Sequence, residues 1–164
     1  GFTTIMLFIC AAVVFALNVY FNDFENGKIL NMTNCGGTKI TNEQAYSGTH
    51  SLKATAGASN FCLNLEDLVN WLNQAGNESY TTVTLRMKAD PATVSQIRVL
   101  PTNTVGGGYQ VNGAYAFGYY APTTDWVLVT IDAAAFRQGF SCLQFLNTAG
   151  KALGTIYIDD ISVA

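Results

Sequence analysis

The sequence GFTTIMLFICAAVVFALNVYFN, residues 1–22, divides the chain into two parts of different character. This segment contains no charged side chain, no proline and no internal glycine. As an α-helix rising about 1.5 Å per residue it would be roughly 30 Å long, close to the thickness of a bilayer's hydrocarbon layer. We therefore predict a hydrophobic N-terminal helix over residues 1–22, buried in lipid or against other copies of itself.

Three interpretations of this segment compete. A helix that packs against its copies agrees with Ala11, Ala12 and Ala16, which permit close backbone approach, and with Asn18, whose amide seeks a partner in an apolar setting. Alternatively, Asn18 lies at a membrane interface beside Tyr20. A plain membrane anchor explains the length, although no Lys or Arg brackets the segment on its N-terminal side. A secretory signal peptide would have a basic start and a small-residue cleavage site, and neither is clear.

Residues 23–164 predict one β-rich domain. Short runs of β-branched and aromatic residues are separated by Gly, Asn and Thr, and the clearest run, residues 80–89, alternates between apolar and polar side chains. We expect strands at residues 28–32, 38–41, 51–56, 61–65, 80–89, 94–100, 108–120, 126–131, 141–146 and 155–163. One helix is expected at residues 66–75, with Asn64 as its cap. The predicted fold is mainly β: an N-terminal hydrophobic α-helix followed by a jelly-roll β-sandwich.

Composition argues against several functions. Only 12% of the residues are charged and the net charge is −3, so no basic patch supports binding of nucleic acid. The single histidine, His50, excludes a cluster of histidine ligands and has no nucleophile motif beside it. Asp159 and Asp160 are neighbours on a predicted strand and point to opposite faces, which does not suit paired acid catalysis. We expect a protein that is not an enzyme.

The start Gly-Phe-Thr-Thr-Ile, followed by an unbroken apolar segment, resembles the mature start of type IV pilins. Met6 stands where that family has the acid that pairs with the α-amino group of a neighbouring subunit. A first residue other than Met agrees with removal of a leader. The resemblance implies an extracellular, cell-surface filament whose subunits are membrane-inserted before assembly and then form a homopolymer through the helix. The residues assigned to this assembly are Gly1, Phe2, Met6, Ala11, Ala12, Ala16 and Asn18.

A second resemblance covers residues 23–163. Asp-Phe-Glu-Asn-Gly at 23–27, Ala-Tyr-Ser-Gly-Thr-His-Ser-Leu-Lys at 45–53, Thr-Asp-Trp at 124–126 and Ile-Tyr-Ile-Asp-Asp-Ile-Ser at 156–162 resemble carbohydrate-binding modules attached to xylanases and glucanases. The resemblance implies a galactose-binding-like jelly roll that binds polysaccharide. Tethered by the N-terminal helix, such a module would be a membrane-anchored carbohydrate-binding protein, which is the alternative to the filament subunit.

This second resemblance also implies a structural calcium ion. The matching ligand positions are Glu25, Asp160 and the neighbourhood of Thr49, with Asp23 as an additional ligand. Carboxylate and carbonyl oxygens suit a hard cation. Asp160 has the same strand parity as Ile156 and Ile158, so we expect it to point inward with them. The alternative is that these acids are ordinary loop residues.

A sugar site is expected to be aromatic, because sugars stack their C–H faces on aromatic rings while polar neighbours bond the hydroxyls. Alternate residues of the predicted strand 108–120 are aromatic, and we expect them to share one face; the candidates are Tyr109, Tyr115, Phe117 and Tyr119, with Arg98 and Gln110 as polar contacts. The alternative is that these rings pack in the core or between subunits. Trp126 is expected in the core.

The remaining predictions concern covalent chemistry. An oxidising compartment would allow a disulfide, and Cys35 with Cys62 is the expected pair because both lie in early strands. Cys142 is expected to be buried, and Cys10 to act as a small apolar residue of the helix. Asn31 and Asn77 lie in Asn-x-Ser/Thr sequons and are candidate glycosylation sites.

Overall fold

The computed structural model describes residues 21–33, 37–103 and 107–164. Most of the predicted N-terminal helix lies outside these residues, as do all seven residues assigned to filament assembly: Gly1, Phe2, Met6, Ala11, Ala12, Ala16 and Asn18. In the described part of the chain, no helix has the length and apolar character needed to cross a membrane.

The end of the predicted helix is wrong. Phe21–Asn22 forms strand β1, which pairs antiparallel with β14 (Gly154–Val163) in the register Phe21 to Ser162. Asn22 is buried, and its side-chain oxygen accepts a hydrogen bond from the backbone N–H of Phe24 at 3.0 Å. A side chain that satisfies the backbone in this way competes with helical hydrogen bonding, so the sandwich begins at residue 21 rather than 23.

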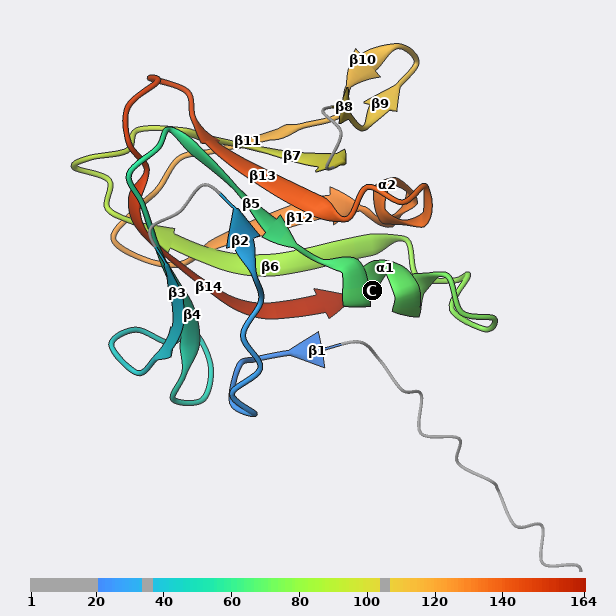
Figure 1. Ribbon diagram of the computed structural model, residues 1–164, viewed down its shortest axis with the longest axis horizontal. Coiled ribbons are helices and arrows are strands. Elements are labelled where there is room, and N and C mark those ends of the chain that lie inside the picture. Colours follow the sequence, from blue (N-terminus) through green and yellow to red (C-terminus); the bar gives the residue numbers. More distant parts are fainter. Residues whose placement is uncertain (1–20, 34–36, 104–106) are drawn as a thin grey trace, which may run out of the picture.

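Two antiparallel sheets form the domain and lie face to face (Figure 1). Sheet A has the order β12-β6-β14-β4-β3, with β1 also on β14. Its other strands are β12 (Val127–Asp132), β6 (Thr82–Ala89), β4 (Ser51–Ala56) and β3 (Thr38–Thr41). Sheet B has the order β11-β7-β13-β5-β2, with β8 (Gly107–Gly108) on β7. Its members are β11 (Gly118–Tyr120), β7 (Ile97–Asn103), β13 (Cys142–Asn147), β5 (Asn60–Asn64) and β2 (Met32–Thr33). The predicted mainly β sandwich is confirmed.

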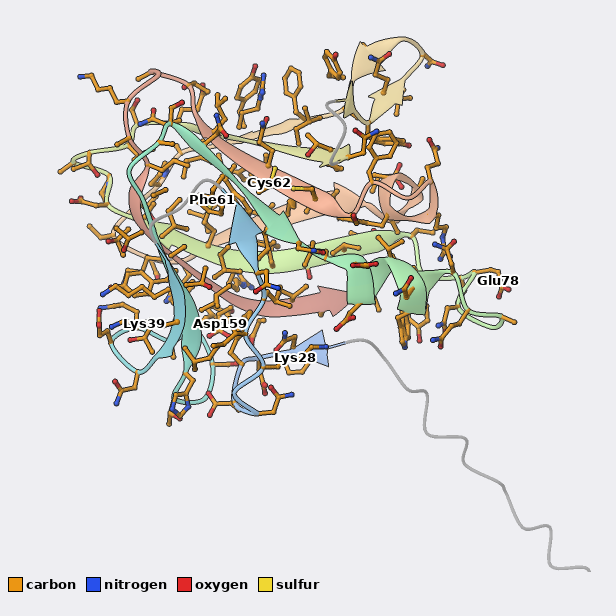
Figure 2. All side chains as sticks on the ribbon, in the orientation of Figure 1. Lys28, Lys39, Phe61, Cys62, Glu78 and Asp159 are labelled. Atoms are coloured by element: carbon orange, nitrogen blue, oxygen red, sulfur yellow. The ribbon has the colours of Figure 1, made fainter. Side chains whose placement is uncertain are left out.

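The core lies between the two sheets because each strand turns alternate side chains inward. In β6 the alternation predicted for residues 80–89 is confirmed: Val83, Leu85 and Met87 are buried. In sheet B the rings of Phe61 and Phe145 stack with centroids 5.0 Å apart. Phe61 and Cys62, the outward-facing residue beside it in β5, are labelled in Figure 2.

Two short helices close one end of the sandwich (Figure 1). Helix α1 (Glu66–Leu72) occupies most of the range predicted for a helix, and its apolar side faces the core. Helix α2 (Ala133–Arg137) was not predicted, since five residues are too few to show helical periodicity. Its N-cap is Asp132, whose carboxylate accepts the N–H of Ala134 at 2.8 Å. Arg137 donates to the backbone oxygens of Asn77 and Tyr80 at 2.7 and 2.8 Å, which joins α2 to the loop after α1.

The prediction that Trp126 belongs to the core is wrong. Trp126 is half-buried and precedes β12 at the rim of sheet A, where its ring meets that of Tyr46 edge-on with centroids 6.2 Å apart. The Arg86 side chain points out of sheet A, and its guanidinium carbon lies 4.2 Å from the centroid of the Tyr46 ring. The outer face of sheet A therefore carries a cation–aromatic contact of its own.

Candidate functional site

The outer face of sheet B is built by the strand positions that do not point into the core. In β7, Ile97 and Val99 are core residues, so Arg98 between them points outward. In β13, Leu143 and Phe145 are core residues, and Gln144 points outward. The strand register sets Arg98 opposite Tyr119 of β11 on one side and opposite Leu146 of β13 on the other.

Arg98 is held in place by its neighbours. Its Nη2 donates to the side-chain oxygen of Gln144 at 3.1 Å, and its guanidinium carbon lies 5.5 Å from the centroid of the Phe117 ring. The Nε of Arg98 is buried and, within the described residues, has no hydrogen-bond partner. Such an unsatisfied nitrogen costs about 1–3 kcal/mol. A buried nitrogen of this kind calls for a partner, and an oxygen atom of a bound ligand would be one.

Two aromatic side chains lie beside Arg98, and a third lies farther along β7 at Gly108. The rings of Phe117 and Tyr119 meet edge-on with centroids 4.9 Å apart, and Tyr119 is 53% exposed. Tyr115 is equally exposed and lies across Gly108: a Cβ on that glycine would stand 2.8 Å from the Tyr115 ring. The residue type at position 108 thus lets Tyr115 approach the sheet. We call Arg98, Tyr115, Phe117, Tyr119 and Gln144 the aromatic face.

The continuous strand predicted for residues 108–120 is wrong, and with it the expected single aromatic face of that strand. The segment consists of β8, β9 (Gln110–Val111), β10 (Ala114–Tyr115) and β11. Asn112 and Gly113, with φ angles of 53° and 81°, reverse the chain between β9 and β10. Both positive φ values identify the kind of two-residue hairpin turn that an Asn-Gly pair favours, and this pair was the signal that could have revealed it.

This turn separates the predicted sugar-site residues. Tyr109 is 5% exposed and packs edge-on against Phe140 with ring centroids 5.7 Å apart, so it is a buried residue and not a stacking surface. Gln110 is exposed and opposes Tyr115 in the hairpin. The structure therefore brings together Arg98, Phe117 and Tyr119, and it places Tyr115 and Gln110 opposite each other in the hairpin. The prediction missed Gln144, although its parity within residues 141–146 placed it outward.

Two cysteines lie on the same outer face of sheet B. Cys62 of β5 is labelled in Figure 2, and its sulfur lies 3.6 Å from the hydroxyl oxygen of Thr102. A hydrogen bond with the Cys62 side chain, together with burial, raises the pKa of the Cys142 thiol far above its ordinary range. The predicted burial of Cys142 is confirmed. Cys35 lies outside the described residues, so the Cys35–Cys62 disulfide stays a prediction, and Cys10 is likewise outside them.

The residues predicted to bind calcium instead hold a loop by hydrogen bonds. Glu25 accepts the backbone N–H groups of Thr49 and His50 at 2.7 and 2.6 Å, and its second oxygen lies 2.9 Å from the Thr49 hydroxyl and 3.0 Å from Nδ1 of His50. The His50 side chain first, and then the two backbone bonds, lower the pKa of Glu25 to about 2. One carboxylate oxygen of Glu25 thus accepts two backbone N–H groups, and the other lies within hydrogen-bond distance of two side chains.

The fully buried acid of β14 is Asp159, which lies opposite Arg86 on the outer face of sheet A. Asp160 has a φ of 46°, and the register of β14 shifts between Asp159 and Ser162, which is a β-bulge. The extra residue reverses the parity beyond the bulge, where Ile161 and Val163 are buried. Asp159 precedes the bulge and is buried beneath loop 46–47. Its carboxylate accepts the N–H groups of Tyr46 and Ser47 at 2.7 and 3.3 Å, and burial raises its pKa.

In this structure Glu25, Thr49 and Asp160 make hydrogen bonds within the protein. The carboxylates face N–H and O–H donors, whereas calcium needs converging oxygen acceptors. In the described residues no group of three or more Asp, Glu, His or Cys side chains is arranged to hold a metal. The remaining candidate, Asp23, accepts the N–H of Glu25 at 3.1 Å in a local turn. Calcium binding stays a prediction for direct measurement.

The two candidate glycosylation sites differ. Asn31 is exposed beside β2. The side-chain nitrogen of Asn77, the atom that a glycan would modify, donates to the backbone oxygen of Trp71 at 2.7 Å. Glycosylation at either residue stays a prediction, and the Asn77 site would require that bond to break.

The sequence matches no protein-family model and no curated protein. Solved structures do match. One is the CBM22-1 xylan-binding domain from Paenibacillus barcinonensis Xyn10C, with 24% identity and a TM-score of 0.54 over 89% of this chain and 93% of that one. The CBM22-2 xylan-binding domain of the same protein gives 13% identity and a TM-score of 0.56 over 88% of this chain and 98% of that one. The fold is that of a carbohydrate-binding module.

At these identities the likeness establishes the fold and leaves the ligand open. It confirms the predicted resemblance for residues 23–163. Both matched structures are named as xylan-binding domains, and the expectation that this chain is not an enzyme stays a prediction. The likeness covers the sandwich and offers no support for the resemblance to type IV pilins or for a homopolymer.

Proposed function

We propose that this protein binds a polysaccharide through the aromatic face of sheet B. The observation that carries the proposal is the position of Arg98, which pairs with Tyr119 in the sheet, lies over the Phe117 ring and is tied to Gln144. Flat rings suit the C–H faces of sugars, and the guanidinium and amide can bond hydroxyl groups on the same surface. A binding site made this way needs no acid–base pair.

Xylan is the first ligand to test, because both similar domains described above are named as xylan-binding. The aromatic face has the flat, exposed rings that an extended chain of sugars would cover. We expect binding without hydrolysis. If the chain is exported, as its apolar N-terminus suggests, the ligand is met outside the cell.

The test is affinity electrophoresis of the full chain through gels containing soluble xylan, with Tyr119→Ala as the variant. Loss of a stacking ring of this kind costs about 1–2 kcal/mol, so we expect a 5- to 30-fold weaker affinity. Leu128→Ala is the matched control, because Leu128 is 45% exposed on the outer face of sheet A. Equal retardation of both variants and the wild type would contradict the proposal.

We also propose, from the sequence of residues 1–22 alone, that the apolar segment joins subunits of a cell-surface filament. The support is its uncharged composition and its pilin-like start. Burial of an apolar helix is favourable by about 25 cal/mol per Å² and could drive such assembly. Electron microscopy and mass spectrometry of fibres sheared from the source cells test this: fibres made of this chain support it, whereas a chain found only in the membrane fraction supports the anchor.

A further inference from the structure

The outer face of sheet A has a hollow that the aromatic face does not involve. Its volume is about 400 Å³, and it lies where the end of β6 meets β14 and three loops. Its polar lining combines one aromatic ring with amide, ammonium, carboxylate and hydroxyl groups: Gln44, Lys88, Asp90, Thr124, Thr155 and Tyr157. A space of that size, with both a ring and hydrogen-bonding groups, has the character of a small-ligand site.

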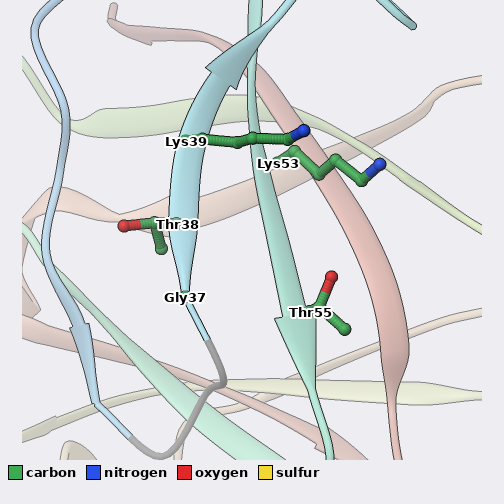
Figure 3. Close-up of a pocket in the computed structure, with 5 residues that line it drawn as sticks. All are labelled: Gly37, Thr38, Lys39, Lys53 and Thr55. Atoms are coloured by element: carbon green, nitrogen blue, oxygen red, sulfur yellow. The ribbon is translucent and has the colours of Figure 1, made fainter.

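A row of cationic side chains crosses the sheet beside this hollow. Strand register sets Lys39 of β3 opposite Lys53 of β4, Lys53 opposite Tyr157 of β14, and Tyr157 opposite Lys88 of β6. Figure 3 shows Lys39 and Lys53 running side by side along a second hollow of about 350 Å³. Lys53 Nζ lies 5.7 Å from the centroid of the Tyr157 ring. Like charges directly opposite each other destabilise a sheet, so this row has a cost.

Acidic side chains pair with some lysines of this row and not with others. Glu43 pairs with both Lys39, at 3.5 Å, and Lys53, and its pKa is lowered to about 2, chiefly by the hydrogen bond from Lys53. Lys88 instead donates to the neutral amide oxygen of Gln44 at 2.9 Å.

Asp90 and Asp159 each accept hydrogen bonds from backbone N–H groups. Asp90, in the same hollow, uses one carboxylate oxygen to accept the N–H of Ala92 at 2.9 Å. The carboxylate of Asp159, in the neighbouring strand β14, accepts hydrogen bonds from the backbone N–H groups of loop 46–47. Within the described residues, Lys88 therefore has a neutral hydrogen-bond partner, unlike Lys39 and Lys53 of the same row.

We propose that this hollow binds an acidic sugar unit, a uronate, of a polysaccharide. The sugar carboxylate pairs with Lys88 and lies within the field of Lys53, the sugar ring lies against Tyr157, and the threonine hydroxyls and Asp90 bond its hydroxyl groups. Charge-assisted hydrogen bonds to a carboxylate are the strong ones in such a site. A recess with an aromatic wall favours one sugar ring over a flat lipid surface. This site is separate from the aromatic face and stands or falls without it.

The experiment is isothermal titration calorimetry of the full chain with a galacturonate oligosaccharide, compared with an uncharged xylose oligosaccharide of equal length. We expect Lys88→Gln to weaken binding of the acidic probe about tenfold. Lys151→Gln, which removes the same charge from an exposed turn outside both hollows, is the matched control and should bind as the wild type does. Tyr119→Ala should also leave this binding unchanged, which separates the proposal from that for sheet B.

Three outcomes would overturn the proposal: no binding of the acidic probe, equal weakening by Lys88→Gln and Lys151→Gln, or Lys88-dependent binding to phosphatidylserine vesicles without binding to the probe. If Lys88→Gln lowers the thermal midpoint, Lys39→Gln replaces it, since the Lys39 side chain is 63% exposed. That variant should weaken binding two- to threefold and reduce its salt dependence. An unchanged affinity would then count against the proposal.

Discussion

The outer faces of the two sheets come from the same alternation of strand residues and yet differ in chemistry. Sheet B exposes rings around a single cation, Arg98, one of whose nitrogens lacks a partner within the described chain. Sheet A exposes a row of lysines, of which Lys39 and Lys53 share one carboxylate. Both sheets contribute apolar side chains to the core between them. The comparison teaches that a sandwich leaves both outer faces open to specialisation, since the fold depends only on the inward positions.

The largest expected effect comes from a substitution in the core, which supports both outer faces. Phe145 is fully buried and stacks on Phe61 in the middle of the core. Phe145→Ala should lower the free energy of unfolding by about 3–5 kcal/mol, through lost burial and the cavity it leaves. Chemical denaturation measures this. If ligand binding to both faces survives unchanged with a loss below about 1 kcal/mol, the core does not couple them in the way described.

An intermediate effect should appear on sheet A alone, at acid pH. The lowered pKa of Glu25 means that its hydrogen bonds stabilise loop 46–50 fully above about pH 4.5 and lose this contribution as the pH falls toward 2. Glu25→Gln should therefore flatten the decline of the thermal midpoint across that range. Its loop carries Tyr46, which covers Arg86 on sheet A.

The control for that prediction is the opposite face. NMR signals of Tyr46 should shift between pH 4.5 and 2 in the wild type, while those of Tyr119 stay constant. A decline in the midpoint that is the same in wild type and Glu25→Gln would show that Glu25 does not anchor the loop.

The smallest effect is expected from Tyr157→Phe. The Tyr157 hydroxyl donates to Glu43 at 3.1 Å on the exposed side of sheet A, and the ring remains after substitution. Stability should change by no more than about 0.5 kcal/mol, as is usual for surface positions. The thermal midpoint measures this, and a loss above about 2 kcal/mol would mean that the polar contacts of sheet A carry the fold.

The alternation of apolar and polar residues predicted which side chains face the core wherever a strand had no bulge or turn. The alternation of residues 80–89 predicted which side chains of β6 are buried, and Arg98 pointed outward as a ligand residue should. It failed where one residue changed the parity. The bulge at Asp160 moved the inward parity of β14 to Ile161 and Val163, and the Asn112–Gly113 turn broke the predicted strand in which Tyr109 was expected to be exposed.

Contacts between distant segments were beyond the reach of sequence patterns. The hydrogen bond between Arg98 and Gln144 joins β7 to β13, and the sequence around neither residue predicts it. The row of Lys39, Lys53 and Lys88 depends on the register of four strands that are far apart in the chain. Such sets arise from strand pairing, which parity within one strand does not specify.

The most direct test of the central claim is an NMR titration of the labelled full chain with a xylose oligosaccharide. The account predicts that amide and side-chain shifts concentrate on the aromatic face of sheet B, at Arg98, Tyr115, Phe117, Tyr119 and Gln144, while Leu128 and Tyr157 on sheet A stay unchanged. Shifts confined to sheet A, or none at saturating ligand, would contradict it.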